Sequence, residues 1–108
     1  MKINEELENA TTAIALFIIN DKQFEPYRRT TVWISGESTE VYPVECGYEE
    51  SNNTYYITIQ LYTSNPYWYA KVRSLLKRVR TEFPQNTIKH NIYKYDGSRP
   101  YELELYIS

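Results

Sequence analysis

Five basic side chains lie close together in the second half of the chain, and their chemistry is suited to binding phosphate. They follow the aromatic run Tyr67-Trp68-Tyr69 and comprise Lys71, Arg73, Lys77, Arg78 and Arg80. Aromatic and basic residues together are typical of single-stranded nucleic-acid sites. A nucleic-acid module would also be basic overall and carry a recognition motif, whereas this chain has a net charge of −2. The sequence therefore disfavours nucleic acid as a partner, and the basic residues equally suit the solvated face of a packed helix.

The residue types that most often perform catalysis or bind metals are isolated in this sequence. Cys46 is the only cysteine and His90 the only histidine, so no internal disulfide and no histidine metal pair can form. Glu102 and Glu104 are two residues apart on the polar face of a predicted strand. They are more simply solvated charges than an acid–base pair, which needs one carboxyl in an apolar setting. We therefore expect a non-enzymatic protein that uses no metal and no cofactor.

The single cysteine and the N-terminal sequence both bear on location. A chain without disulfides fits a reducing compartment. The apolar run at residues 13–19 follows glutamates rather than basic residues, and it is too short to span a bilayer. We expect a protein that is cytoplasmic when it is made and has no membrane partner.

Acidic residues and tyrosines precede the basic segment. Residues 30–70 contain no lysine or arginine, and their acidic residues are Glu37, Glu40, Glu45, Glu49 and Glu50. Residues 71–108 carry eight basic and four acidic residues. Two such patches can meet across a head-to-tail interface between copies, or both can simply face solvent. The chain has 12 tyrosines, too many for a small core, so we expect Tyr56 and Tyr62 to anchor a protein–protein surface.

Hydrophobic periodicity predicts two helices and about five strands. Helical spacing covers residues 4–20, with Asn4 as the N-cap, and residues 66–83, whose apolar stripe comprises Trp68, Val72, Leu75, Leu76, Val79 and Phe83. Strand patterns cover residues 31–35, 40–47 and 54–63, and a hairpin about Asp96-Gly97 follows the second helix. The order α-β-β-β-α-β-β predicts a single α+β domain, residues 1–108, with two helices on an antiparallel sheet of about five strands.

The C-terminal hairpin is predicted without a fixed register. A two-residue loop at Asp96-Gly97 would pair Ile88 with Leu105 and His90 with Leu103. A four-residue loop changes these partners but keeps the same faces, because side chains alternate with a period of two. Either loop gives the hairpin one apolar and one polar face.

Three segments carry a resemblance to a known family. They are "TTVWISG" as the first strand, "NNTYYITIQLYTSNP" as a long strand running into a helix, and "YELELYIS" as the last strand. In this order of elements the chain resembles the tail-terminator (tail-completion) proteins of long-tailed bacteriophages. The resemblance implies a head-to-tail ring, commonly hexameric, that caps the tail tube and is incorporated into the virion. It implies no catalytic residue.

The alternative interpretation is a small inhibitor or immunity-type protein that binds one enzyme or nuclease. Its acidic, tyrosine-rich residues 37–56 would then form the binding face. The oligomeric state separates the two hypotheses, because a ring subunit forms a large closed oligomer whereas an inhibitor is a monomer or dimer.

Overall fold

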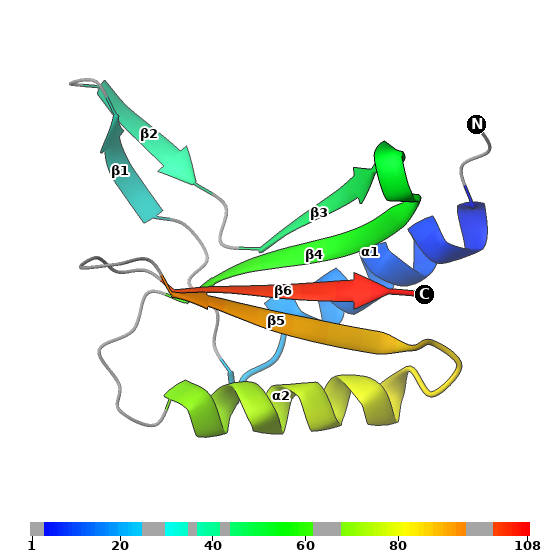
Figure 1. Ribbon diagram of the computed structural model, residues 1–108. Coiled ribbons are helices and arrows are strands. Elements are labelled where there is room, and N and C mark those ends of the chain that lie inside the picture. The colour runs from blue at the N-terminus through cyan, green and yellow to red at the C-terminus, as the bar shows by residue number, and fades with distance from the viewer. Residues whose placement is uncertain (1–3, 25–29, 35–36, 42–43, 62–67, 95–100) are drawn as a thin grey trace.

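The computed structural model describes residues 4–24, 30–34, 37–41, 44–61, 68–94 and 101–108, and for residues 30–34, 37–41, 68, 94 and 101 the description covers the backbone alone. This part of the chain holds two α-helices, a four-stranded antiparallel sheet and a separate two-stranded sheet (Figure 1). The predicted α+β class is confirmed. The prediction of about five strands in one sheet is wrong, since the main sheet has four strands and two more pair apart from it.

Helix α1 (Glu5–Ile19) begins where the sequence predicts. The side chain of Asn4 accepts a hydrogen bond of 3.2 Å from the backbone N–H of Leu7, which satisfies one of the free donors at the helix start. The first turn is acidic, as the helix dipole favours. One side of α1 is buried against the sheet, and its buried residues are Thr11, Ile14, Ala15 and Ile18.

Strands β1 (Thr30–Ile34) and β2 (Glu37–Val41) form an antiparallel hairpin, which we call the arm. The prediction of one strand over residues 40–47 is wrong, because these residues are divided between the end of β2 and the start of β3 (Val44–Glu49). Pro43 lies in the gap, outside the described residues, and proline has no N–H with which to continue a ladder. The observed order is therefore α-β-β-β-β-α-β-β.

The four-stranded sheet has the order β3-β4-β6-β5, with β4 (Thr54–Leu61) and β6 (Tyr101–Ile107) in the centre. A short 3-10 helix, η1 (Glu50–Asn52), and Asn53 in a left-handed conformation (φ 53°) form the turn between β3 and β4. The alternation predicted for β4 is confirmed, and its buried residues are Tyr55, Ile57, Ile59 and Leu61.

Strand β5 (Ile88–Lys94) is an edge strand paired with β6. Ile88 lies opposite Ile107 and His90 lies opposite Leu105, so the register of a two-residue loop is wrong by two residues. A shift of two keeps every side chain on its predicted face. The turn at Asp96-Gly97 lies outside the described residues.

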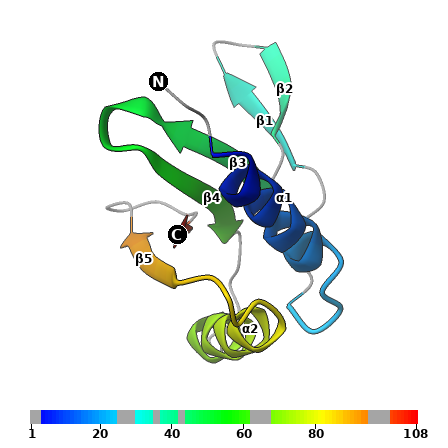
Figure 2. The same cartoon turned by 90° about the vertical axis from the view of Figure 1, so that its right-hand side faces the viewer.

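Helix α2 (Trp68–Glu82) covers the same face of the sheet as α1 (Figure 2). The apolar stripe is confirmed where side chains are described, with Val72, Leu75, Leu76 and Val79 buried and Phe83 packed against the core. The rings of Phe17 and Phe83 meet edge to face, 5.8 Å between centroids, and so join the two helices. The side chain of Trp68 lies outside the description, as do Asn65 and Pro66.

The opposite face of the sheet is not covered by any described helix (Figure 2). Neither α1 nor α2, the helices in the described part of the chain, is long and apolar enough to cross a bilayer.

Candidate protein-interaction site

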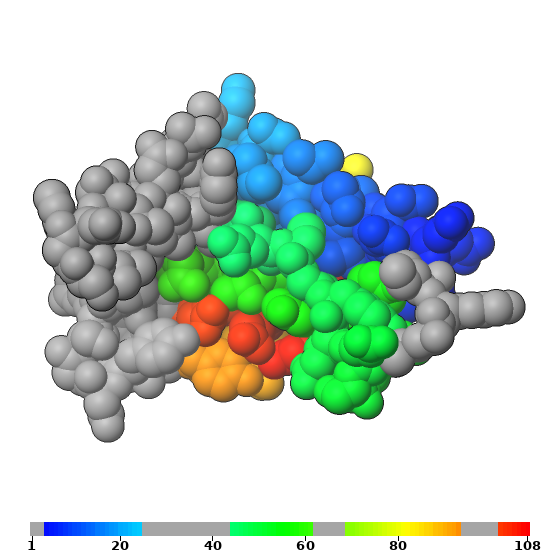
Figure 3. All heavy atoms as spheres, turned by 90° about the horizontal axis from the view of Figure 1, so that it is seen from above, coloured from blue at the N-terminus to red at the C-terminus, as the bar shows by residue number. Residues whose placement is uncertain are grey.

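The uncovered side of the four-stranded sheet, which we call the open face, collects polar and aromatic side chains. Strand alternation that buries Ile57 and Ile59 must place Tyr56 and Thr58 on the other side. The pairing of β4 with its neighbours then sets the rest of the face beside them. Its central residues are Glu45, Gly47, Tyr56, Thr58, Gln60, Lys89, Asn91, Tyr93, Glu102, Glu104 and Tyr106. Figure 3 shows α1 on one side of β3 and β4, and β6 and β5 toward the other.

A hollow of about 740 Å³ lies on the open face and extends to η1. Four carboxylates line it, from Glu49, Glu50, Glu102 and Glu104, together with the tyrosines Tyr48, Tyr56, Tyr93 and Tyr106. None of the residues that line it is lysine or arginine, and Lys89 lies on the same face beside Tyr106 without lining the hollow. Carboxylates bind ammonium and guanidinium groups directly, and tyrosine rings attract cations over their faces. The hollow is therefore suited to basic side chains of a protein partner.

Hydrogen bonds hold the polar groups of the hollow in place. The Tyr106 hydroxyl donates to Glu104 Oε2 at 2.5 Å and lies 3.3 Å from the Tyr93 hydroxyl. The hydrogen bond to the Glu104 carboxylate raises the pKa of Tyr106 well above its usual value, and the contact with Tyr93 adds to this. Gln60 Nε2 donates to Glu102 Oε1 at 3.3 Å. Both carboxylates are thus held in a fixed orientation within the protomer.

The position of the Tyr56 ring depends on a glycine in the neighbouring strand. Gly47 lies directly opposite Tyr56, and a Cβ built on Gly47 would come within 2.2 Å of Tyr56 Cζ. The aromatic ring therefore occupies the space that a side chain at position 47 would need. The absence of a side chain at Gly47 therefore lets the Tyr56 ring lie over β3.

The basic residues of α2 lie in the other layer of the molecule. Lys71, Arg73, Lys77 and Arg80 are exposed, whereas Arg78 is half-buried. Figure 2 shows α2 against one face of the sheet. The hollow lies on the other face, so it and the solvent side of α2 point in different directions. Arg80 also donates to the carbonyl oxygen of Ile88, from Nε at 3.2 Å and Nη2 at 2.8 Å, which ties α2 to β5.

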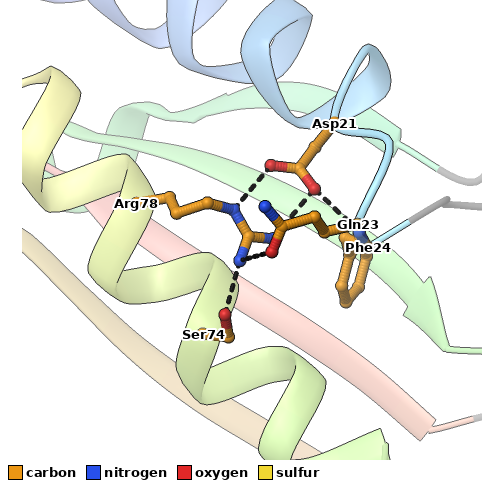
Figure 4. Close-up of polar contacts among 5 residues, drawn as sticks. All are labelled: Asp21, Gln23, Phe24, Ser74 and Arg78. Atoms are coloured by element: carbon orange, nitrogen blue, oxygen red, sulfur yellow. Dashed lines mark hydrogen bonds and ion pairs between the residues drawn. The ribbon is translucent and has the colours of Figure 1, made fainter.

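Arg78 is engaged inside the protomer (Figure 4). Its Nε and Nη2 donate to the two carboxylate oxygens of Asp21 at 2.9 and 2.8 Å, and its Nη1 donates to Gln23 and Ser74. Burial opposes ionisation of Asp21, but the hydrogen bonds from Arg78 and from the backbone N–H of Phe24 outweigh it and hold the pKa of this carboxyl below its usual value. The ion pair fastens the segment after α1 to α2.

The structure brings together part of the predicted acidic and tyrosine set. Glu49, Glu50 and Tyr56 line the hollow, and Glu45 lies on the same face of the sheet. Glu37 and Glu40 lie on β2, where only the backbone is described, and Tyr62 lies outside the described residues. Sequence reasoning missed the contribution of Glu102 and Glu104, although their alternation with buried Leu103 and Leu105 was a usable signal.

Cys46 lies away from the open face, at the edge of the sheet beside α1. Its thiol is 4.0 Å from the carbonyl oxygen of Thr11, and burial raises the pKa of the thiol. A protonated thiol is a poor nucleophile and a poor metal ligand. Within the described ranges no group of three or more histidine, cysteine, aspartate or glutamate side chains is arranged to hold a metal ion.

These features define an α+β protein with one sheet face covered by helices and the other carrying an acidic, tyrosine-lined hollow. The chain matches no protein-family model, and no match was found among curated proteins or solved structures.

Proposed function

We propose that the protein is a non-enzymatic subunit that assembles head to tail, and that its assembly is a ring of the phage tail-terminator or head–tail connector type. The observation that carries the proposal is the separation of charge between the two layers of the fold. The open face is acidic, whereas the exposed side of α2 is basic.

Like charges would meet if two copies joined through the same surface. A symmetric dimer through the open face would bring the carboxylates of both copies together, and a dimer through α2 would do the same with its lysines and arginines. Juxtaposed like charges are strongly disfavoured at interfaces. A contact between α2 of one copy and the open face of the next pairs opposite charges instead, and such a heterologous contact closes into a ring when the rotation permits.

The dimensions of the two surfaces are compatible. Helix α2 has 15 residues and is therefore about 22 Å long at ~1.5 Å per residue. Strand β4 has eight residues and spans about 26 Å at ~3.3 Å per residue. A helix of this length fits along the open face without reaching far beyond it.

Aromatic residues are needed to give such a contact affinity, because exposed ion pairs contribute little. Tyr93 on the open face is 42% exposed and Tyr69 on α2 is 52% exposed. Tyrosine is favoured at the centres of protein interfaces, where its ring is buried and its hydroxyl can still find a partner. The charges then select the partner and its orientation, and the tyrosines supply buried area.

A second candidate function uses the hollow alone. An inhibitor or immunity-type protein would receive basic side chains of a single target enzyme between Glu49, Glu50, Glu102 and Glu104. The size and acidity of the hollow favour this candidate, which also requires the protein to be a monomer or dimer.

Sedimentation of the purified protein over a range of concentrations and salt distinguishes the two. We expect a large closed oligomer at low salt, or one that forms on a tail-tube protein, and weaker association as salt screens the charges. A protein that is monomeric under all these conditions would overturn the ring proposal and leave the inhibitor.

A further inference from the structure

The outer edge of β5 presents backbone groups that a further strand can pair with. Thr87 and Ser108 exchange two hydrogen bonds, of 2.9 and 3.0 Å, and are therefore a hydrogen-bonded pair of the antiparallel ladder. Such pairs recur at every second residue. The backbone N–H and C=O groups of Lys89, Asn91 and Tyr93 therefore point toward β6. The N–H and C=O groups of Ile88, His90 and Ile92 must then point outward from the sheet.

Among the described residues, one end of this edge is capped and positions 90 and 92 are not. The guanidinium of Arg80 donates to the outward carbonyl oxygen of Ile88, which also confirms the direction of that group. No described residue forms a hydrogen bond with the outward backbone groups of His90 or Ile92. An uncapped edge strand is a template for pairing with another chain.

The backbone of the arm pairs within itself and with no other described strand. Strands β1 and β2 pair with each other and make at most slight contact with the described helices and the four-stranded sheet (Figure 1). A two-stranded hairpin by itself is marginally stable in water. No other described strand pairs with either of its outer edges, so addition to another sheet would stabilise it.

Charge and position make the β5 edge of a second copy a suitable acceptor for the arm. The arm carries Glu37 and Glu40 and no basic residue, whereas β5 carries Lys89, His90 and Lys94 and no acidic residue. The arm leads directly into β3, which is the opposite edge of the sheet from β5. One copy thus has a strand pair that can be added, the arm, on one side and an edge that can accept it, β5, on the other, as a head-to-tail assembly requires.

We infer that the arm of one copy adds to the β5 edge of the next copy and extends its sheet across the subunit boundary. The inference rests on the proposed self-assembly and names a contact within it. The arm would approach beside α2. Glu37 and Glu40 are three residues apart in β2 and belong to opposite faces of the arm, so one of them lies on the face turned toward the basic side of the neighbour.

A proline at position 90 tests the acceptor edge. His90→Pro removes an N–H that points outward, so the β5–β6 ladder keeps all its bonds, and proline is tolerated at such edge positions. His90→Ala is the matched control because it removes the same side chain and keeps the N–H. We expect His90→Pro to weaken self-association by at least about tenfold and His90→Ala to leave it nearly unchanged. Circular dichroism and thermal unfolding of both variants verify the fold.

Mixing two defective variants tests the arm as the occupant. A variant with residues 31–40 replaced by a short Gly-Ser turn keeps the acceptor edge, and His90→Pro keeps the arm. Each alone should fail to form the wild-type oligomer, and their mixture should yield a 1:1 dimer in sedimentation.

If both variants associate like the wild type, the inference is wrong while the proposed assembly stands. If only His90→Pro fails, the edge accepts another segment and the arm is wrong as occupant. A wild type that is monomeric throughout overturns both proposals.

Discussion

Asp21 and Arg78 form a two-pronged ion pair that joins the segment after α1 to the middle of α2, although 57 residues separate them in sequence. The side chains are 7% and 23% exposed, respectively, so water screens the pair only partly. Asp21 also accepts a hydrogen bond of 2.7 Å from the backbone N–H of Phe24. Arg78, which the sequence placed among the candidate partner-binding residues, therefore has a structural role within one copy.

Removing the charge of Asp21 should destabilise the fold. Asp21→Asn keeps the size of the side chain but loses the charge-assisted bonds to Arg78, which contribute roughly 1.5–3 kcal/mol when formed to a charged group. We expect a loss of that size in urea unfolding at neutral pH. Glu82→Gln, at an exposed carboxylate of α2, is the control and should change stability little. Equal stability of Asp21→Asn and wild type would show that the pair is not a stabilising contact.

The contribution of Asp21 should disappear in acid. Its pKa in the folded protein lies below the ordinary value of 3.8. A carboxyl whose folded pKa is lowered adds stability that is complete above the unfolded pKa and is lost as pH falls through the folded pKa. The difference in unfolding free energy between wild type and Asp21→Asn should thus be constant near neutrality and shrink below about pH 4. A difference that grows in acid would contradict the assigned direction.

The buried stripe of α2 should be the main support of the core on that side. Leu76 is 2% exposed, and Leu76→Ala should cost roughly 2–5 kcal/mol through lost burial and the cavity left behind. Leu16 on α1 is 54% exposed, so Leu16→Ala deletes the same atoms at a solvated site and should cost much less. Chemical denaturation of both variants measures the difference. Similar costs at the two sites would mean that the stripe is not packed as described.

Nucleic acid should not be a tight ligand of α2. The wild type should show no strong, steeply salt-dependent binding to single-stranded or duplex nucleic acid, because phosphate contacts produce that signature through counterion release. Reversing Arg73 and Lys77 to glutamate should consequently leave any weak binding almost unchanged. Fluorescence anisotropy with labelled oligonucleotides at two salt concentrations decides the matter, and a large loss of affinity in the reversed variant would revive a nucleic-acid role.

The parts of the fold that depend on local sequence were predictable. The Asn4 cap, the alternation of β4 and the stripe of α2 follow from spacing within a few residues, and the structure confirms them. The order of strands in the sheet could not be predicted in this way, because β4 pairs with β6 across at least 40 positions of sequence. The division between β2 and β3 was missed because the strand pattern runs on through Pro43.

The candidate site was predictable only in part, because it too depends on pairing between strands that are distant in sequence. Glu49, Glu50 and Tyr56 stood out by composition, whereas their meeting with Glu102 and Glu104 depends on the pairing of β4 with β6. Arg78 was grouped with the other basic residues because its partner Asp21 is distant in sequence. Side-chain type indicated a charged interaction surface, and tertiary pairing decided which charges remain available to it.

A reciprocal charge exchange tests most directly whether the open face of one copy meets α2 of another. Glu49 and Glu50 are changed to lysine in one variant, Arg73 and Lys77 to glutamate in a second, and all four in a third. Arg78 and Arg80 are left alone because they hold the fold together. Glu5 and Glu6 changed to lysine form the control, since these exposed residues lie on α1, away from the open face.

Sedimentation equilibrium of this set gives the decisive comparison. Each single-surface variant should associate at least about tenfold more weakly than the wild type, the fourfold exchange should recover part of the loss, and the α1 control should stay near the wild type. A fourfold exchange that associates no better than either single-surface variant would contradict the account, as would a wild type that remains monomeric at every concentration.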